Sequence, residues 1–244
     1  MSQELGRVEK PEAAQYGNKR KVYLVPLIMA PQEPPADFAA ILERYWSGAD
    51  DGVQKLEWRI GDVKYVFMET VDRSGEGGIK LAEQRSPGAA GLAERRVDRG
   101  ASFIAMEDPE TFAEVLDWER CLYIGLISRK VYDQVSQSFQ DASRRRYEHM
   151  AKKLEQTLKE GEAALLFLSE HHRLQFPEGV QVFYVAPPAL DEVRRWQRDY
   201  REKMAREEEE AGRPAQQAGE EGQPKQPEGP EAETPPEGPA REEP

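Results

Sequence analysis

The stretch Ala163–Leu168, which reads Ala-Ala-Leu-Leu-Phe-Leu, is apolar throughout and has the length of one β-strand. Neighbouring side chains of a strand point to opposite sides of a sheet, so a fully apolar strand is covered on both faces. Such strands are typical of parallel sheets flanked by helices. We therefore expect this segment inside an α/β sheet. The polar residues 169–173 should then emerge at the carboxyl edge, where open α/β sheets bind ligands.

Other strand-like segments alternate with helical patterns along the chain. Strands are predicted at 22–29, 63–70, 102–106 and 180–185. Pro26 predicts that the first of these lies at an edge or ends early, because proline donates no hydrogen bond to a neighbouring strand. Helices are predicted at 36–47 with a continuation through 53–60, at 79–99 with a break at 87–88, over 109–159 in two or three pieces, and at 188–204. This order predicts an α/β fold, with a mainly parallel or mixed sheet flanked by helices.

Composition divides the chain into three parts. Residues 1–20 are predicted to be a flexible lead-in, and residues 21–204 a single α/β domain. Residues 205–244 contain no aromatic residue, Val, Ile or Leu, so they have too little apolar surface to offset the entropy of ordering. We expect them to form a disordered acidic tail rich in Glu, Pro and Gly. This segment has 12 Glu against 4 Lys plus Arg, which accounts for −8 of the total net charge of −12.

Charge and cysteine content exclude several classes of function. The first 204 residues keep a net charge of only −4, whereas a nucleic-acid-binding protein normally presents a basic face. The single cysteine, Cys121, excludes an intrachain disulfide and a multi-cysteine metal site. No apolar stretch has the length of a membrane span, and residues 1–21 have no hydrophobic signal core. We therefore expect a cytoplasmic protein that has neither a nucleic acid nor a membrane as its partner.

Polar residues suited to catalysis or ligand binding follow the predicted strands. Glu69 ends the second strand, Glu107 follows the third, and His171 and His172 follow Ala163–Leu168. The carboxyl ends of parallel strands share one edge of a sheet, so we expect these side chains to lie near one another. Neutral imidazole can serve as a general base or a metal ligand, but only one of two adjacent side chains in an extended segment can face a given cleft. The alternative is a solvated strand end beside a helix cap.

Three consecutive arginines, Arg144, Arg145 and Arg146, lie in the long predicted helical segment. Successive helical residues are rotated by about 100°, so only one or two of these side chains can face one site. A guanidinium group binds carboxylate or phosphate through two parallel hydrogen bonds. We assign Arg146 to the predicted site, with surface solvation as the alternative for the three.

The order of these motifs resembles the TraB, EreA and ChaN-like group, also called the TIKI superfamily. The shared features are the acidic strand end Phe-Met-Glu at 67–69, the Arg-x-x-x-Met-Ala helical segment at 146–151, and the apolar strand before His172. The resemblance implies a cleft in which a strand-end carboxylate and a histidine bind metal or act in hydrolysis. It implies Glu69, His172 and Arg146 as catalytic residues, and Glu69, Glu107 and His172 as ligands of a divalent metal.

A second class of function is a non-catalytic interaction or regulatory protein that presents its helices and acidic tail to a protein partner. This alternative is favoured by the segment after the first predicted strand, which has no histidine, whereas the TIKI group usually has a histidine or glutamate there. Residues 165–170 are also similar to a strand of the C-terminal domain of class-1 release factors, which implies a ribosome-associated role. The two expectations are thus a metal-dependent hydrolase or small-molecule-binding protein, and an interaction protein.

Overall fold

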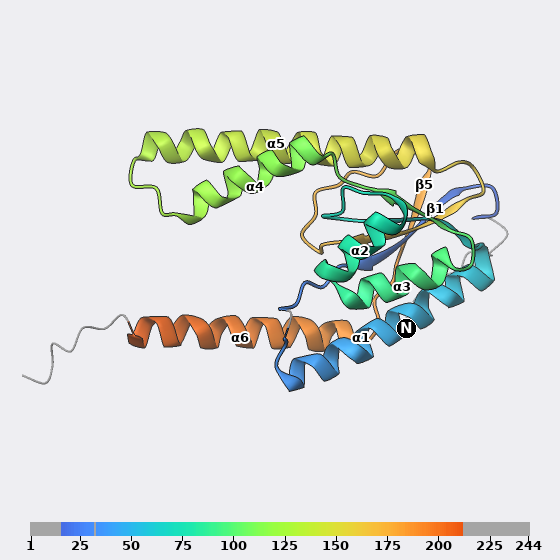
Figure 1. Cartoon of the computed structure of the whole chain (residues 1–244), viewed down its shortest axis with the longest axis horizontal. Helices are drawn as coiled ribbons and strands as arrows, with labels where there is room; N and C mark the ends of the chain where they lie inside the picture. The colour runs from blue at the N-terminus through green and yellow to red at the C-terminus, as the bar shows by residue number, and fades with distance from the viewer. Residues whose placement is uncertain (1–15, 32, 212–244) are drawn as a thin grey trace, which may run out of the picture. The chain divides into compact units, whose positions relative to one another are not determined.

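The computed structural model describes residues 16–31 and 33–211 (Figure 1). The chain divides into two compact units, Met1–Arg198 and Asp199–Pro244. The first unit contains a five-stranded sheet in the order β3-β2-β4-β1-β5, and every neighbouring pair of strands is parallel. The strands are β1 (Arg20–Pro26), β2 (Val63–Met68), β3 (Ser102–Ala105), β4 (Ala163–Leu168) and β5 (Val180–Tyr184). The predicted α/β class with a mainly parallel sheet is confirmed.

Six helices connect or follow these strands. They are α1 (Ala36–Ile60), α2 (Gly75–Arg85), α3 (Pro87–Val97), α4 (Pro109–Tyr123), α5 (Arg129–Thr157) and α6 (Ala189–Ala211). None of the helices in the described part of the chain is both long and apolar enough to cross a membrane. Helix α6 runs past Arg198, so its last residues belong to the second unit.

Strand β4 is the central strand, and all six of its residues are buried. It pairs with β1 on one side, where Leu24 lies opposite Leu166, and with β2 on the other, where Phe67 lies opposite the same residue. Its apolar side chains therefore face helices above and below the sheet, as the sequence predicted. This placement puts the carboxyl end of β4 beside that of β2.

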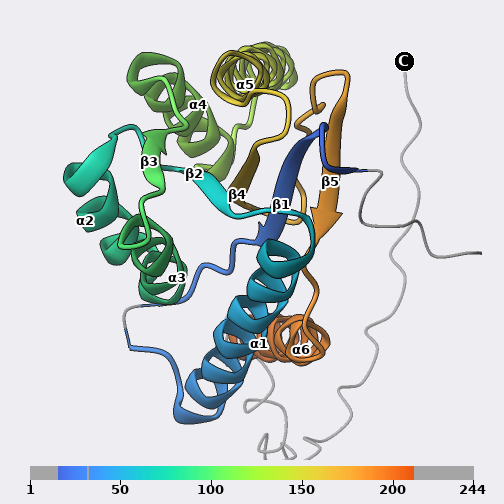
Figure 2. The same cartoon turned by 90° about the vertical axis from the view of Figure 1, so that its right-hand side faces the viewer.

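The helices form two layers on opposite faces of the sheet (Figure 2). Helices α1, α2 and α3 and the first turns of α6 share one core with the sheet, while α5 and the loop after β4 share the other. Crossover connections between parallel strands are right-handed, so the direction in which a connection runs along the sheet decides the face on which it lies. The connections β1 to β2 and β2 to β3 run toward one edge of the sheet, whereas those from β3 to β4 and β4 to β5 run back.

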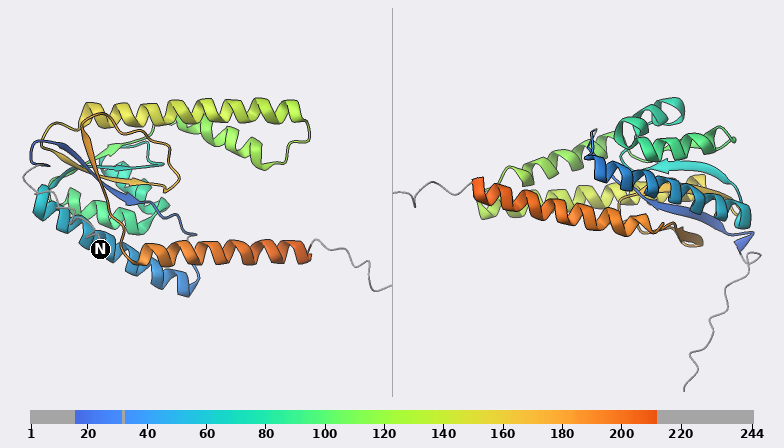
Figure 3. Two further views of the ribbon diagram at one scale, coloured as in Figure 1. Left: turned by 180° about the vertical axis from the view of Figure 1, so that it is seen from behind. Right: turned by 90° about the horizontal axis from the view of Figure 1, so that it is seen from below.

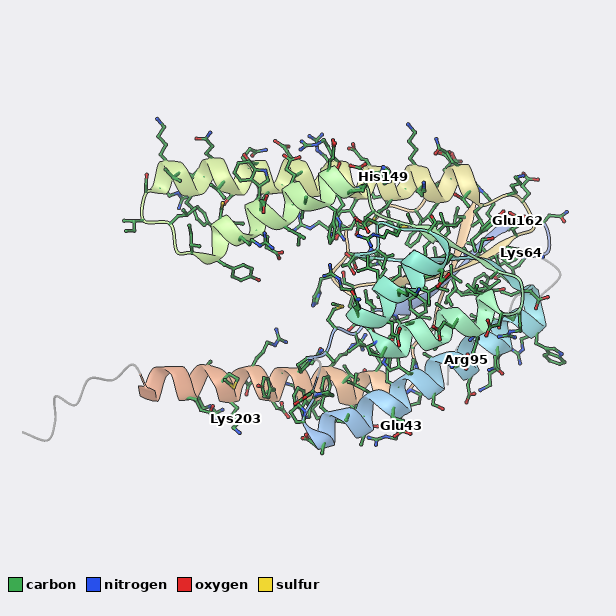
Figure 4. The ribbon with its side chains drawn as sticks, viewed as in Figure 1. Glu43, Lys64, Arg95, His149, Glu162 and Lys203 are labelled. Carbon is green, nitrogen blue, oxygen red and sulfur yellow. The ribbon has the colours of Figure 1, made fainter. Side chains whose placement is uncertain are left out.

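A buried network of ion pairs joins α1 and α3 on the first face of the sheet. Arg96 is 1% exposed and bonds to Asp50 and, at 3.2 Å, to Glu57. Arg95, labelled between α3 and α1 in Figure 4, forms an ion pair of 2.9 Å with Asp50. An arginine held between two carboxylates thus joins two neighbouring helices of the same layer.

Two of the predicted boundaries are confirmed and one is wrong. Strand β1 ends early, at Pro26, which is one of the two outcomes expected from the proline; the other does not occur, because β1 lies between β4 and β5 and not at an edge. The helical zone predicted in two or three pieces forms two helices, with the break after Tyr123, where Gly125 has a positive φ of 73°. Helix α6 continues to Ala211, through residues assigned to the tail, because Glu and Ala are strong helix formers and i,i+4 pairs such as Lys203–Glu207 support it. The rest of the predicted tail, and residues 1–15 of the lead-in, lie outside the described residues.

Helices α4 and α5 form a helical hairpin that extends well beyond the sheet (Figure 3). Only the second half of α5 packs on the sheet, through Met150 and Leu154. The first half of α5 packs against α4, with Val115 and Val135 buried between the two helices. The loop at 124–128 therefore lies at the end of the hairpin that is distant from the sheet.

Candidate functional site

The carboxyl ends of β2 and β4 lie side by side at a switch point of the topology. The chain leaves β2 toward β3 at one edge of the sheet, and leaves β4 toward β5 at the other. Open α/β sheets bind ligands in the crevice outside such a point. Glu69 follows β2 and Ser169 follows β4, and the Ser169 N–H donates a 2.7 Å hydrogen bond to Glu69 Oε2.

Three of the four predicted site residues meet in this crevice as a buried ion cluster. The Arg146 guanidinium, from α5, donates to Glu107 Oε2 at 2.8 Å and also bonds to Glu107 Oε1. Its Nη2 donates to Glu69 Oε1 at 3.1 Å. We call Glu69, Glu107 and Arg146 the ion cluster. It joins the end of β2, the segment between β3 and α4, and the middle of α5.

The backbone after β2 positions the two carboxylates. The Val71 carbonyl accepts hydrogen bonds from the N–H groups of Met106 and Glu107, at 3.0 and 3.1 Å. The Thr70 N–H donates to Glu107 Oε1 at 2.8 Å. Thr70 has a φ of 72°, a left-handed conformation that is unfavourable for a β-branched residue, and its buried hydroxyl has no partner among the described residues. Strain of this kind concentrates at ligand sites and switch regions.

Electrostatics favour the charged form of Arg146. Burial by itself lowers the pKa of the guanidinium, but the hydrogen bonds and charge of Glu107, together with the charge of Glu69, outweigh it and raise the pKa. The guanidinium also lies 5.0 Å from the ring centroid of Phe112 and 5.6 Å from that of Tyr147, within cation-π range. The arginine is therefore fully charged and is enclosed by two carboxylates and two aromatic rings.

The fourth predicted residue, His172, lies near the cluster but is not bonded to it. Its ring contacts Phe176 edge-on, with centroids 6.1 Å apart, and its buried Nδ1 has no partner among the described residues. Burial lowers the pKa of His172, and the nearby Glu69 carboxylate only partly opposes that shift. The imidazole is therefore neutral at pH 7 and can accept a hydrogen bond or a proton.

Neighbouring side chains after β4 diverge at a turn, which replaces the expected extended segment and in which the His172 N–H donates a 3.2 Å hydrogen bond to the Ser169 carbonyl. Glu170 lies on the α6 side, where it accepts hydrogen bonds from Arg194 and from the Tyr184 hydroxyl. The Arg194 hydrogen bonds lower the pKa of Glu170. His171 is exposed, and His149, the third histidine of the chain, lies on α5 (Figure 4). Of the two adjacent histidines, His172 is therefore the one that lies near the ion cluster.

The donor geometry does not fit a metal ion at the predicted ligands. The oxygens of Glu69 and Glu107 already accept hydrogen bonds from Arg146 and from backbone N–H groups, and a guanidinium occupies the space between the two carboxylates. Within residues 16–31 and 33–211, no three His, Cys, Asp or Glu side chains form a group that could hold a metal. The metal site inferred from the resemblance stays a prediction, and we derive no chemical step through it.

The three arginines separate as helical geometry requires. Arg144 forms a surface pair with Asp141, Arg145 reaches Glu114 of α4 at 2.6 Å, and only Arg146 is buried. Beside Arg146, a groove of about 770 Å³ runs between α5 and the loop after β4. Its lining includes Gln140, Arg144, Tyr147, Arg173 and Phe176. The groove has the volume of a small-molecule site, with two aromatic rings and several polar side chains.

The distant end of the helical hairpin exposes large apolar side chains. Tyr123 is 82% exposed, Ile124 75% and Ile127 102%, and nearly half of Val131 and of Tyr132 is also exposed. We call these five residues the hairpin tip. All five lie between residues 123 and 132, in the 124–128 loop and at the ends of the two helices beside it. A concentration of large exposed apolar side chains usually marks an interaction site.

Comparison of the chain with protein-family models, with curated proteins and with solved structures gives no match. Neither Thr70 nor the hairpin tip was predicted from the sequence. Gly125, within the apolar run 122–127, was the one signal that the helix would break there and leave apolar residues on a loop.

Proposed function

We propose that this protein is a non-catalytic interaction protein whose α4–α5 hairpin binds a partner protein. The observation that carries the proposal is the exposure of the hairpin tip, where Ile127 is 102% exposed and Tyr123 is 82% exposed. Leaving five large apolar side chains in water is unfavourable unless a partner covers them. Tyr and Ile side chains at the centre of such a surface supply most of the binding energy when they become buried.

The ion cluster supports this role as a structural attachment. Glu107 lies two residues before the start of α4, and Arg146 lies on α5, so their bidentate hydrogen bonds join the bases of the two hairpin helices. The bond from Arg146 to Glu69 attaches both helices to the sheet. Every carboxylate of the cluster is thereby used in bonds within the protein. Such a cluster holds the hairpin at a fixed angle and leaves its tip free to bind.

A photocrosslinking amino acid at Tyr123 tests the proposal. Illumination in cells of the source organism should yield a defined covalent adduct, identified by mass spectrometry, because Tyr123 lies at the centre of the proposed surface. The adduct should disappear when Ile127→Asp is added. The same probe at Trp58, an apolar residue of α1 that is 87% exposed and outside the hairpin, serves as the matched control. Absence of an adduct specific to Tyr123 would refute the proposal.

A second candidate, ligand binding or hydrolysis of the TraB/ChaN-like type, is favoured by one set of observations. The ion cluster lies at the switch point of the sheet, beside the strained Thr70 and the unpartnered His172 Nδ1. Zn²⁺, Mn²⁺, Fe²⁺ and Mg²⁺ can each be titrated while calorimetry follows unfolding, since a bound metal raises stability by mass action. A rise that is lost in His172→Ala but kept in His149→Ala would favour this candidate. No rise with any metal would remove its metal-dependent form.

A further inference from the structure

We infer that the partner of the hairpin is a second copy of this chain, and that two hairpins pack together as a four-helix bundle around a two-fold axis. This inference rests on the proposed function and names its partner. Three features of the hairpin support the inference. They are an apolar stripe of α5 that becomes exposed near the tip, the area of exposed apolar surface, and the net charge of the residues around the tip.

One apolar stripe of α5 packs on the sheet at one end of the helix, on α4 in the middle, and is exposed near the tip. Near the base, Met150 and Leu154 pack on the sheet, and Arg146, on the same face, enters the ion cluster. One and three turns nearer the tip, Ala142 and Val135 are buried against α4. Val131, one turn farther on the same stripe, is 45% exposed.

A pair of helices can bury only the side chains that face each other. In the hairpin, Val115 and Val135 are buried between the helices, while Leu116, Leu122, Leu126 and Phe139 are only partly covered. Four-helix bundles solve this geometry by packing a second pair of helices on the open side of the first. A second identical hairpin presents the same apolar side, so a two-fold arrangement covers both.

The exposed area matches what a stable dimer needs. The hairpin tip contributes on the order of 600 Å² of accessible surface, taking roughly 150 to 200 Å² for each fully exposed large side chain. The partly covered leucines and Phe139 add to it. A standard stable interface buries about 800 Å² from each partner. Tyr123, Tyr132 and the isoleucines would form the apolar centre of such an interface.

The charges around the hairpin tip sum to zero, which favours a second copy of this chain as the partner. The acidic residues Asp117, Glu119 and Asp133 are matched by the basic residues Arg120, Arg129 and Lys130. Arg120 pairs with Asp117 at 3.0 Å, and Arg129 with Asp133 at 2.9 Å. The tip is therefore neutral in a chain of net charge −12, so two tips approach without repulsion. It is not the basic surface that a nucleic acid or an anionic membrane would require.

Sedimentation equilibrium of the full chain over a concentration series tests the inference. The parent protein should be a dimer, and Ile127→Asp should weaken the dimer at least 100-fold. The matched control, Trp58→Asp, also places a charge at a highly exposed apolar residue and should leave the dimer unchanged. Ile127 makes no buried contact, so circular dichroism should show Ile127→Asp folded with an unchanged melting temperature. Hydrogen exchange at residues 123–132 should slow as the parent protein dimerises.

A parent protein that stays monomeric at all concentrations overturns the inference, as does a dimer that Ile127→Asp leaves intact. The photocrosslinking experiment separates this failure from that of the proposed function. If the protein is monomeric and its Tyr123 probe crosslinks to a different protein, the proposed function holds and the partner is that other protein. A monomeric protein whose probe attaches to nothing refutes both.

Discussion

Replacing Arg146 with methionine tests how the hairpin is held on the sheet. Methionine keeps most of the side-chain length but leaves Glu69 and Glu107 buried with no cation between them. The Glu107 side chain is 0% exposed and that of Glu69 is 6% exposed, so solvent does little to screen their charges. Removing one partner of a buried, hydrogen-bonded charge group costs about 3 to 5 kcal/mol. We expect this loss in the free energy of unfolding.

Urea denaturation followed by circular dichroism measures the loss. With a slope of about 2 to 3 kcal/mol/M, the midpoint should fall by about 1 to 2 M. Arg144→Met, two residues away on the same helix, removes a surface pair whose arginine side chain is 66% exposed and should cost less than about 0.5 kcal/mol. A loss for Arg146→Met no larger than that of the control would refute the view that the ion cluster attaches the hairpin.

Removing the two carboxylates gives a second test of the same cluster. Adding Glu69→Gln and Glu107→Gln to Arg146→Met should recover much of the lost stability, because a neutral hydrogen-bonded group costs far less to bury than an unpaired charge. No recovery in the triple variant would mean that lost packing, not charge, is responsible.

The remaining predictions concern the core, the histidine and the C-terminal segment. Leu166→Ala or Phe167→Ala, at residues with no exposure, should each destabilise by about 2 to 5 kcal/mol in urea unfolding, and a loss below about 1 kcal/mol would contradict the central position of β4. Burial lowers the pKa of His172 from 6.5, so as the pH drops below about 7 the unfolded state binds a proton before the folded state does, and stability falls. His172→Gln should flatten this dependence between pH 7 and 5, and an unchanged profile would contradict the burial of the imidazole. Truncation after Ala211 should change the melting temperature by no more than about 2 °C, because residues 212–244 have no large apolar side chain, and a larger drop would show that they dock.

The sequence by itself determined the elements of the fold and their layering. The apolar run Ala163–Leu168 could only be stable as a strand covered on both faces, and strands alternating with helical patterns predicted the parallel sheet. The same logic predicted that Glu69 and Glu107 would lie at one edge, because the carboxyl ends of parallel strands do so. Helical geometry predicted that Arg144, Arg145 and Arg146 would separate. Each of these inferences depends on local periodicity or on the direction of strands.

The tertiary structure decided how those groups are used. Whether Glu69 and Glu107 face a ligand or an internal cation depends on the angle at which α5 crosses the sheet, and that angle brings Arg146 between them. The left-handed Thr70 follows from the loop that joins these carboxylates, since threonine has no intrinsic preference for it. The apolar residues at 123–132 fall within the helical zone predicted over 109–159, and the sequence alone left their exposure open, because periodicity reports which side chains share a face but not what covers it. Only the extent of α4 and α5 beyond the sheet leaves that face open.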